Sequence, residues 1–256
     1  MAHQFARYPS LSGKTVLISG GGSGIGATMV ERFLEQEAKV TFLDVDQRES
    51  EKLVERLGTS KAAVPAFIAC DVTDIAALRS SIVAAEQAMG AIDVLVNNAA
   101  RDDRHNWEQV TPEYWDNAMA VNLRHHFFAI QAVAPGMRTR GSGSIINMSS
   151  ISWVIPSTGL PAYITAKAAI AGLTRTMAHE LGGAGIRVNC ILPGGILTER
   201  QRRLWWTPEY EEEILGNQCI KRILTPDDVA SMVLFLASED SSAVTNQSYV
   251  VDGGWV

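Results

Sequence analysis

Two polar side chains four positions apart suggest acid–base chemistry. Tyr163 and Lys167 lie in residues 161–169, whose composition predicts a helix. Residues four apart share one face of a helix, so the lysine ammonium is expected beside the phenol. A cation within about 4–6 Å favours the phenolate and lowers a pKa that is otherwise about 10. We therefore expect Tyr163 to exchange a proton with the oxygen of a carbinol or carbonyl.

A hydroxyl from a neighbouring strand would complete this set. Ser150 ends the apolar run 145–150, thirteen residues before Tyr163. Its hydroxyl is suited to hydrogen-bond the substrate oxygen. Taken alone, the Tyr–Lys pair also fits an amphipathic helix with a packed tyrosine and a lysine that reaches solvent. The elements that position these residues must therefore decide between the two interpretations.

The first such element is a glycine-rich turn between a predicted strand, 15–19, and a predicted helix from residue 24 onward. Glycines let the main chain approach a pyrophosphate, and the helix start offers it unpaired N–H groups. Strand, turn and helix together predict a dinucleotide site. Two glycine spacings fit, G-x-G-x-x-A at Gly22, Gly24 and Ala27, and G-x-x-x-G-x-G at Gly20, Gly24 and Gly26.

An acidic residue ends the second predicted strand, 39–44. Asp44 follows the glycines by about 20 residues, where a dinucleotide-binding fold places the carboxylate that binds the adenosine ribose. A 2′-phosphate would meet like charge there, so Asp44 favours NAD over NADP. Arg48 offers partial compensation, which leaves NADP open. The alternative for Asp44 is an ordinary helix N-cap.

Composition narrows the class of protein. Of 256 residues, 46% are hydrophobic and 20% are charged, as in soluble globular proteins. No apolar run approaches the roughly 20 residues of a membrane span, and residues 1–8 lack the apolar core of a signal peptide. The net charge of −6 offers no general attraction to nucleic acid or membrane lipid.

Cysteine and histidine positions indicate no metal centre. Cys70, Cys190 and Cys219 form no C-x-x-C motif and fit a reducing cytoplasm. Cys70 and Cys190 lie in strand-like runs and are predicted to be small buried hydrophobic residues. His125 and His126 have no ligand spacing, so we expect them to pack on a helix face.

The order of elements predicts an α/β fold, a single domain over 1–256 with a doubly wound parallel sheet of about seven strands and helices on both faces. Strands are expected at 15–19, 39–44, 64–70, 92–97, 144–149, 186–192 and 248–251, and helices at 24–37, 49–57, 74–89, 113–139, 162–182 and 226–237. A polar loop, 101–107, and a long connection, 196–220, follow strand ends where ligands bind in such sheets. We predict that 196–220 is a substrate lid.

In combination these motifs resemble the short-chain dehydrogenase/reductases over nearly the whole chain. The matching residues are 19–26, 71–72, 97–100, Asn122, Ser150, Tyr163, Lys167, 193–194 and 251–254. The resemblance favours the wider glycine spacing. The chain departs from the family pattern at position 100, where alanine replaces the usual glycine. The methyl group of Ala100 is expected to narrow the space beside the nicotinamide ribose. A milder departure is Ser19, usually threonine.

The resemblance implies a Rossmann-type fold, a nicotinamide cofactor and a homotetramer assembled through the helices at 113–139 and 162–182. It makes Tyr163 the general base or acid and Ser150 the ligand of the substrate oxygen. Lys167 would bind the nicotinamide ribose and lower the tyrosine pKa, and Asn122 would hold a water in the proton relay. The expected cofactor contacts are Gly20, Ser23, Gly24, Ile25, Asp44, Asp71, Val72, Asn98, Tyr163, Lys167, Pro193 and Ile196.

Within this family the chain most resembles bacterial aldose 1-dehydrogenases, which oxidise sugars such as fucose, galactose, arabinose or xylose. The similar segments are 102–105, 121–125, 150–153, 206–209 and 251–255. This resemblance implies hydride transfer from the anomeric carbon of an aldose to NAD(P), giving a lactone.

A sugar needs polar partners for its hydroxyls and an apolar surface for its C–H groups. Asp102 and His105 are predicted to bind hydroxyls, whereas Ser152 and Trp153 are predicted contacts beside Ser150. The other tryptophan candidates for the ring face are Trp205, Trp206 and Trp255. The alternatives are a solvated turn for the loop and core or interface packing for each tryptophan.

Two other functions stay open on the sequence. Arg200, Arg202 and Arg203 suit a reductase of 3-oxoacyl groups on an anionic carrier, but such enzymes usually use NADPH, which Asp44 disfavours. A solvated helix face is the simpler interpretation of these arginines. A non-catalytic dinucleotide sensor would be expected to lack the Ser, Tyr and Lys set, and this chain has all three.

Overall fold

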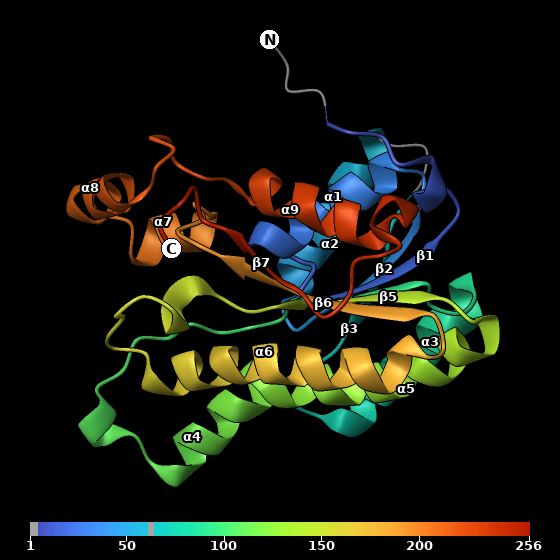
Figure 1. Cartoon of the computed structure of the whole chain (residues 1–256), viewed down its shortest axis with the longest axis horizontal. Coiled ribbons are helices and arrows are strands. Elements are labelled where there is room, and N and C mark those ends of the chain that lie inside the picture. The colour runs from blue at the N-terminus through green and yellow to red at the C-terminus, as the bar shows by residue number, and fades with distance from the viewer. Residues whose placement is uncertain (1–4, 61–63) are drawn as a thin grey trace.

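The computed structural model describes residues 5–60 and 64–256, so residues 1–4 of the segment examined for a signal peptide lie outside it. In the described part, seven parallel strands form one sheet in the order β3-β2-β1-β4-β5-β6-β7. Helices cover both of its faces, as predicted (Figure 1). The strands are β1 (Thr15–Ser19), β2 (Lys39–Asp44), β3 (Ala66–Ala69), β4 (Val94–Asn97), β5 (Gly143–Met148), β6 (Ile186–Pro193) and β7 (Ser248–Val251).

Most helix ends lie within a few residues of the predicted ones, but two short helices in the segment 196–220 were not predicted. The helices are α1 (Gly24–Glu35), α2 (Gln47–Ser60), α3 (Ile75–Met89), α4 (Pro112–Met119), α5 (His125–Arg140), α6 (Pro161–Gly182), α7 (Glu199–Leu204), α8 (Pro208–Asn217) and α9 (Pro226–Ala237). Across the described residues, none of these helices has the length and apolar character required to span a bilayer.

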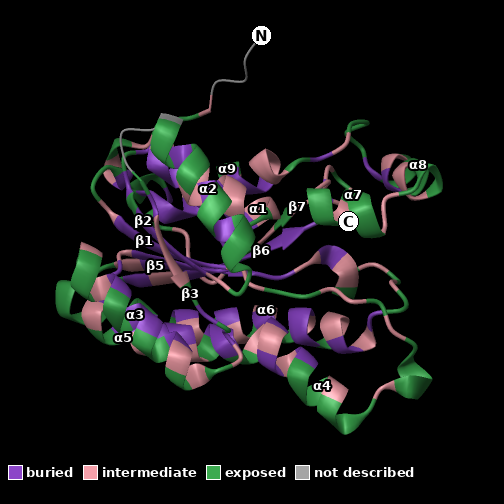
Figure 2. Ribbon diagram, turned by 180° about the vertical axis from the view of Figure 1, so that it is seen from behind, coloured by how far each residue is buried: buried purple, intermediate pink, exposed green. Residues whose placement is uncertain are grey.

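The sheet separates two hydrophobic cores. Successive side chains of a strand point to opposite faces, so Val16 and Ile18 of β1 pack with α1, α2 and α9, whereas Leu17 packs with α3, α5 and α6. Figure 2 shows buried residues along the inner sides of both helix layers. Because β1 and β4 are buried at every position, their sequences are nearly continuous apolar runs.

The predicted helix 113–139 is interrupted. Between α4 and α5 lies a π-helical turn, Ala120–Arg124, that contains Asn122. The Asn122 side chain is buried and bonds both main-chain groups of Arg101. A π turn adds one residue to a helical turn and often marks a functional position. Apolar spacing alone did not reveal it because the residues on both sides remain helical.

Strand order reverses between β1 and β4, which are neighbours although β2 and β3 separate them in the chain. Ligands bind beyond the carboxyl ends of strands at such a switch point. The glycine turn follows β1 and Asn98 follows β4. The topology therefore brings together the motifs that the sequence placed at strand ends.

Close packing explains why glycines follow β1 in this spacing. Gly20 has φ +68°, and a Cβ there would lie 2.7 Å from Ala99 Cα. A Cβ on Gly26, inside α1, would lie 1.8 Å from the Gly20 carbonyl oxygen. Neither position tolerates a side chain, so the wider spacing, with Gly20, Gly24 and Gly26, describes the packing of the turn.

Gly26→Ala should lower the free energy of unfolding by at least 1–3 kcal/mol, the usual range for overpacking. Gly172 is the matched control, because it is exposed in α6 and an added Cβ meets no atom within 4 Å. Gly172→Ala should stabilise the protein by about 1 kcal/mol through helix propensity. Urea unfolding measures both changes. Wild-type stability of Gly26→Ala would contradict the packing argument.

Candidate active site

A cleft of about 620 Å³ opens where the carboxyl ends of β1, β4 and β5 meet. This volume is in the usual range for small-molecule and cofactor sites. The predicted residues that line it are Gly20, Ser23, Gly24, Ile25, Asp44, Asp71, Val72, Asn98, Asp102, Ser150, Tyr163, Lys167, Pro193 and Ile196. Every predicted cofactor contact is thus at the cleft wall.

One end of the cleft fits a dinucleotide. Ser23, at the N-cap of α1, makes no side-chain cap hydrogen bond. The first N–H groups of this twelve-residue helix are therefore free of a side-chain cap and can donate to a ligand. Glycines leave the main chain of the preceding turn bare beside these donors. Unpaired N–H groups and the positive end of a helix dipole suit a pyrophosphate.

Asp44 faces the same end of the cleft. Its carboxylate accepts hydrogen bonds from the main-chain N–H of Gly22 at 2.8 Å and of Asp46 at 2.9 Å. The α2 cap is formed by Asp46, which accepts from Glu49 N at 3.1 Å, so the N-cap alternative for Asp44 is wrong. Arg48 has an 82% exposed side chain and is absent from the described cleft wall.

Asn98 joins the two central strand ends. Its Nδ2 donates to the carbonyl oxygens of Ser19 at 3.1 Å and Gly20 at 2.8 Å. In return, Ser19 Oγ accepts from the N–H groups of Asn98 and Ala99. The hydroxyl kept at position 19 is therefore structural. Ala100 lines the cleft with no positive φ, so its methyl occupies space without straining the backbone.

The proposed proton-transfer residues converge at the other end of the cleft. A hydrogen bond with Ser150 acts on the Tyr163 phenol, and the Lys167 ammonium lies 5.5 Å from the centre of the Tyr163 ring. Lys167 Nζ donates to the Met148 carbonyl at 2.7 Å. Ser149 Oγ donates to the Lys167 carbonyl at 2.7 Å, which fixes α6 to the end of β5.

The prediction that the Tyr163 pKa is lowered is wrong for the protein by itself. Burial raises the pKa of Tyr163 above its ordinary value, the Asp102 charge raises it further, and the hydrogen bond with Ser150 lowers it. Burial also lowers the pKa of Lys167 to about 8. The loss of water around the phenol is therefore the largest influence on the Tyr163 pKa.

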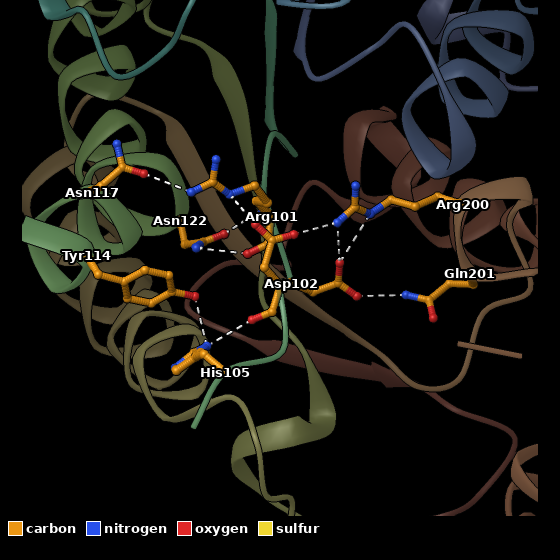
Figure 3. A network of polar contacts seen from close by, with 9 residues as sticks. Arg101, Asp102, His105, Tyr114, Asn117, Asn122, Arg200 and Gln201 are labelled. Carbon is orange, nitrogen blue, oxygen red and sulfur yellow. Dashed lines mark hydrogen bonds and ion pairs between the residues drawn. The ribbon is translucent and has the colours of Figure 1, made fainter. Parts of the chain in front are cut away.

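The Asn122 side chain is paired with the main chain of Arg101. Its Oδ1 accepts from Arg101 N at 2.8 Å, and its Nδ2 donates to Arg101 O at 3.1 Å (Figure 3). This pairing fixes the start of loop 101–107. The predicted role of Asn122 as the holder of a relay water stays a prediction.

The loop after β4 meets the 196–220 segment across the cleft mouth (Figure 3). Arg200 contacts Asp103 Oδ1 at 2.9 Å and Asp102 Oδ1 at 3.3 Å. Gln201 Nε2 donates to Asp102 Oδ2 at 2.8 Å. At its base the segment is fixed by a parallel bridge between Ile196 and Leu224.

Comparisons with known proteins show the family of the chain. Residues 20–256 match the model of a family described as enoyl-(acyl carrier protein) reductase. The chain is 49% identical to a probable galactose dehydrogenase, GalD, of Rhizobium meliloti, with 97% of each chain covered. It is also 49% identical to D-xylose 1-dehydrogenase of Caulobacter vibrioides, with 98% of each covered.

The chain belongs to the short-chain dehydrogenase/reductase family. A solved short-chain type dehydrogenase/reductase from Mycobacterium ulcerans has a TM-score of 0.91 at 27% identity, covering 96% of this chain and 90% of its own. A putative gluconate dehydrogenase from Agrobacterium tumefaciens has the same TM-score and identity, with 98% of each chain covered. The protein is thus a nicotinamide-dependent oxidoreductase that acts on a CH–OH group of a small molecule.

Three predicted substrate contacts of this dehydrogenase lie outside the cleft wall as far as the structure describes it, namely His105, Ser152 and Trp153. His105 instead joins three elements, because its Nδ1 lies 2.8 Å from the Tyr114 hydroxyl and its Nε2 accepts from Ala162 N at 3.4 Å. Trp153 donates to Ser149 Oγ at 3.1 Å. Ser152 and Trp153 are thus absent from the described cleft wall although they follow Ser150 closely in sequence.

Some of the lining residues that the sequence argument missed come from the 196–220 segment. Gln201 and Tyr210 line the cleft together with Trp206, and of these only Trp206 was a candidate. The Trp206 and Tyr210 rings meet edge to face at 5.6 Å between centroids. No local signal identifies them, because their position depends on how these two short helices fold back.

Two histidines behind the cleft of the dehydrogenase are completely buried, as the packing prediction required. His125 Nε2 lies 3.0 Å from the Ala99 carbonyl and His126 Nδ1 lies 3.3 Å from Asn147 Oδ1. Burial lowers the pKa of His125 to about 4 and that of His126 well below its usual value. Both imidazoles are therefore neutral at pH 7.

The buried histidines predict acid sensitivity. The folded pKa of His125, about 4, lies below the unfolded value of 6.5, so the unfolded state binds more protons between these values and stability falls as pH drops. Between pH 7.5 and pH 5 this group should lower the free energy of unfolding by about 2 kcal/mol. In His125→Gln, measured by urea unfolding at both pH values, the free energy of unfolding should fall by about 2 kcal/mol less than in wild type. Equal losses would contradict the assignment.

Proposed function

We propose that the protein oxidises an aldose at its anomeric carbon, giving a lactone, with NAD as the hydride acceptor. The observation that carries the proposal is that Ser150, Tyr163 and Lys167 line one cleft together with Asp44. The sugar-dehydrogenase names of two relatives that are 49% identical support the substrate class.

The proposed proton path begins at the C1 hydroxyl of the sugar. Ser150 holds this oxygen in place, which makes the reaction a positioned transfer instead of a bimolecular encounter. Tyr163, as phenolate, accepts the proton. A bound oxidised nicotinamide would accept the hydride from C1. Since burial raises the pKa of Tyr163, the positive charges of Lys167 and of the cofactor ring must favour the phenolate.

Tyr163→Phe should reduce turnover with an aldose and NAD by at least about 10²–10⁴-fold, the usual contribution of a general base. Ring packing is preserved, so NADH should still bind, as followed by its fluorescence. Thr165→Ala is a control on the same helix, because its hydroxyl bonds only its own helix at the Pro161 carbonyl. Near-normal turnover of Tyr163→Phe would discard Tyr163 as the base.

NAD is proposed over NADP because Asp44 lies in the cleft beside the glycine turn while Arg48 points to solvent. A carboxylate there accepts from ribose hydroxyls and repels a 2′-phosphate.

Asp44→Ser should therefore lower kcat/KM for NAD by about 10-fold or more, the usual worth of a hydrogen bond to a charged group. It should raise kcat/KM for NADP because the repulsion is gone. Steady-state kinetics with both cofactors measures the ratio. Arg48→Ser is the control and should leave this ratio close to that of wild type. An unchanged ratio in Asp44→Ser would contradict the assignment.

We also propose one domain over 1–256, a lid role for 196–220, a homotetramer and a cytoplasmic location. Trp115 on α4 and Phe127 on α5 have 38% and 41% exposed side chains, which supports an interface on this helix layer. Cys219 is exposed and free, which suits a reducing compartment.

A further inference from the structure

Two adjacent carboxylates at the cleft mouth have different surroundings. Both oxygens of Asp103 are paired, one with Arg200 at 2.9 Å and the other with Arg101 at 2.7 Å. Asp103 is also absent from the described cleft wall. Asp102 does line the cleft, with 26% of its side chain exposed. The two residues therefore cannot do the same work.

Asp102 keeps the capacity to bind a ligand. A carboxylate offers about four lone-pair sites. Arg200 occupies Oδ1 through contacts of 3.3 Å, and Gln201 donates to Oδ2 at 2.8 Å. At least one lone pair of Oδ2 is left for a donor, and a sugar hydroxyl is such a donor.

The charge of Asp102 also opposes the proposed chemistry. It raises the pKa of Tyr163 and so disfavours the phenolate that would act as base. Sites that violate a local physical rule are often functional. An acidic side chain in this place is best explained by a gain in substrate binding.

We propose that Asp102 accepts a hydrogen bond from the C2 hydroxyl of the aldose, and that Arg200 and Gln201 hold its carboxylate in position from the 196–220 segment. This inference rests on the proposed function. Asp102 is thus a specificity-determining residue, whereas Arg200 and Gln201 are positioning residues. The substrate class becomes an aldose with a free hydroxyl next to the anomeric carbon.

The choice of C2 follows from proximity. The C1 oxygen is held between Ser150 and Tyr163, and C2 carries the nearest hydroxyl of the ring. Asp102 lines the cleft with Ser150 and Tyr163 and follows β4, the neighbour of the strand that precedes Ser150. Its charge also acts on both Tyr163 and Lys167. Asp44 and Asp71 instead follow β2 and β3, farther along the sheet. Galactose and xylose, in the names of the two relatives, have the same configuration at C2 in their D forms.

The site is complete only with α7 in place. Arg200 and Gln201 both belong to α7, and Thr198 Oγ accepts from Gln201 N at 3.2 Å, which sets the start of this helix. Arg104 lies over the Trp205 ring at 5.2 Å and adds a second contact between the loop and the segment. Docking of α7 therefore orients the carboxylate.

The test combines removal of the Asp102 side chain from the protein with removal of the C2 hydroxyl from the sugar. The sugar is D-galactose or D-xylose, whichever the wild-type enzyme oxidises faster, and it is compared with its 2-deoxy analogue by kcat/KM with NAD. Wild type should prefer the parent sugar by about 10–100-fold, as for a hydrogen bond to a charged group. Asp102→Ala should bring this preference to within a few-fold of unity.

Three further variants sharpen the result. Asp103→Ala, the matched control, should keep the wild-type preference, because Asp103 touches Arg200 but not the cleft. Gln201→Ala should narrow the preference several-fold, through KM more than kcat. Asp102→Asn is isosteric, which guards against a folding defect, and it should retain part of the preference because its amide oxygen still accepts.

Equal loss on both sugars in Asp102→Ala or Asp102→Asn would overturn this inference and leave the proposed function standing. A loss of the preference in Asp103→Ala as complete as in Asp102→Ala would overturn it in the same way. A wild-type enzyme that reduces no NAD with galactose, xylose, arabinose or fucose would reject the proposed function, and this inference with it.

Discussion

A buried cation between helix α6 and strand β5 is the interaction on which the proton-transfer end of the cleft depends. Lys167 is 2% exposed, and its ammonium donates to the Met148 carbonyl. A buried charge is tolerated only with good hydrogen bonds. Burial lowers the pKa of Lys167 to about 8. The contacts of Lys167 with Met148 and Ser149 join the helix to the strand end, and this places Tyr163 against Ser150.

Much of this arrangement could be predicted from local sequence. A parallel sheet collects the carboxyl ends of its strands at one edge, so the glycine turn, Asp44, Asn98 and Ser150 had to meet once the strands were recognised. Glycine at position 26 reports a contact too close for any side chain. In these cases the residue type alone indicates the local structure, and the residues line the cleft.

What could not be predicted depends on packing between distant segments. The π turn contains Asn122, whose side chain pairs with Arg101 in the loop after β4. Gln201 and Tyr210 reach the cleft because α7 and α8 fold back over it. The direction of the Tyr163 pKa shift likewise depends on burial and on the Asp102 charge, which both raise the pKa, and neither can be read from a four-residue spacing.

The bridge between Ile196 and Leu224 has a consequence for how such enzymes diversify. Both ends of the intervening chain are fixed at one point, and the entropy of closing a loop grows slowly with its length. The sheet and the residues Ser150, Tyr163 and Lys167 lie outside this segment, which is also anchored by buried side chains such as Ile214 and Gln218. Exposed positions of this segment can therefore vary in evolution while Ser150, Tyr163 and Lys167 keep their places.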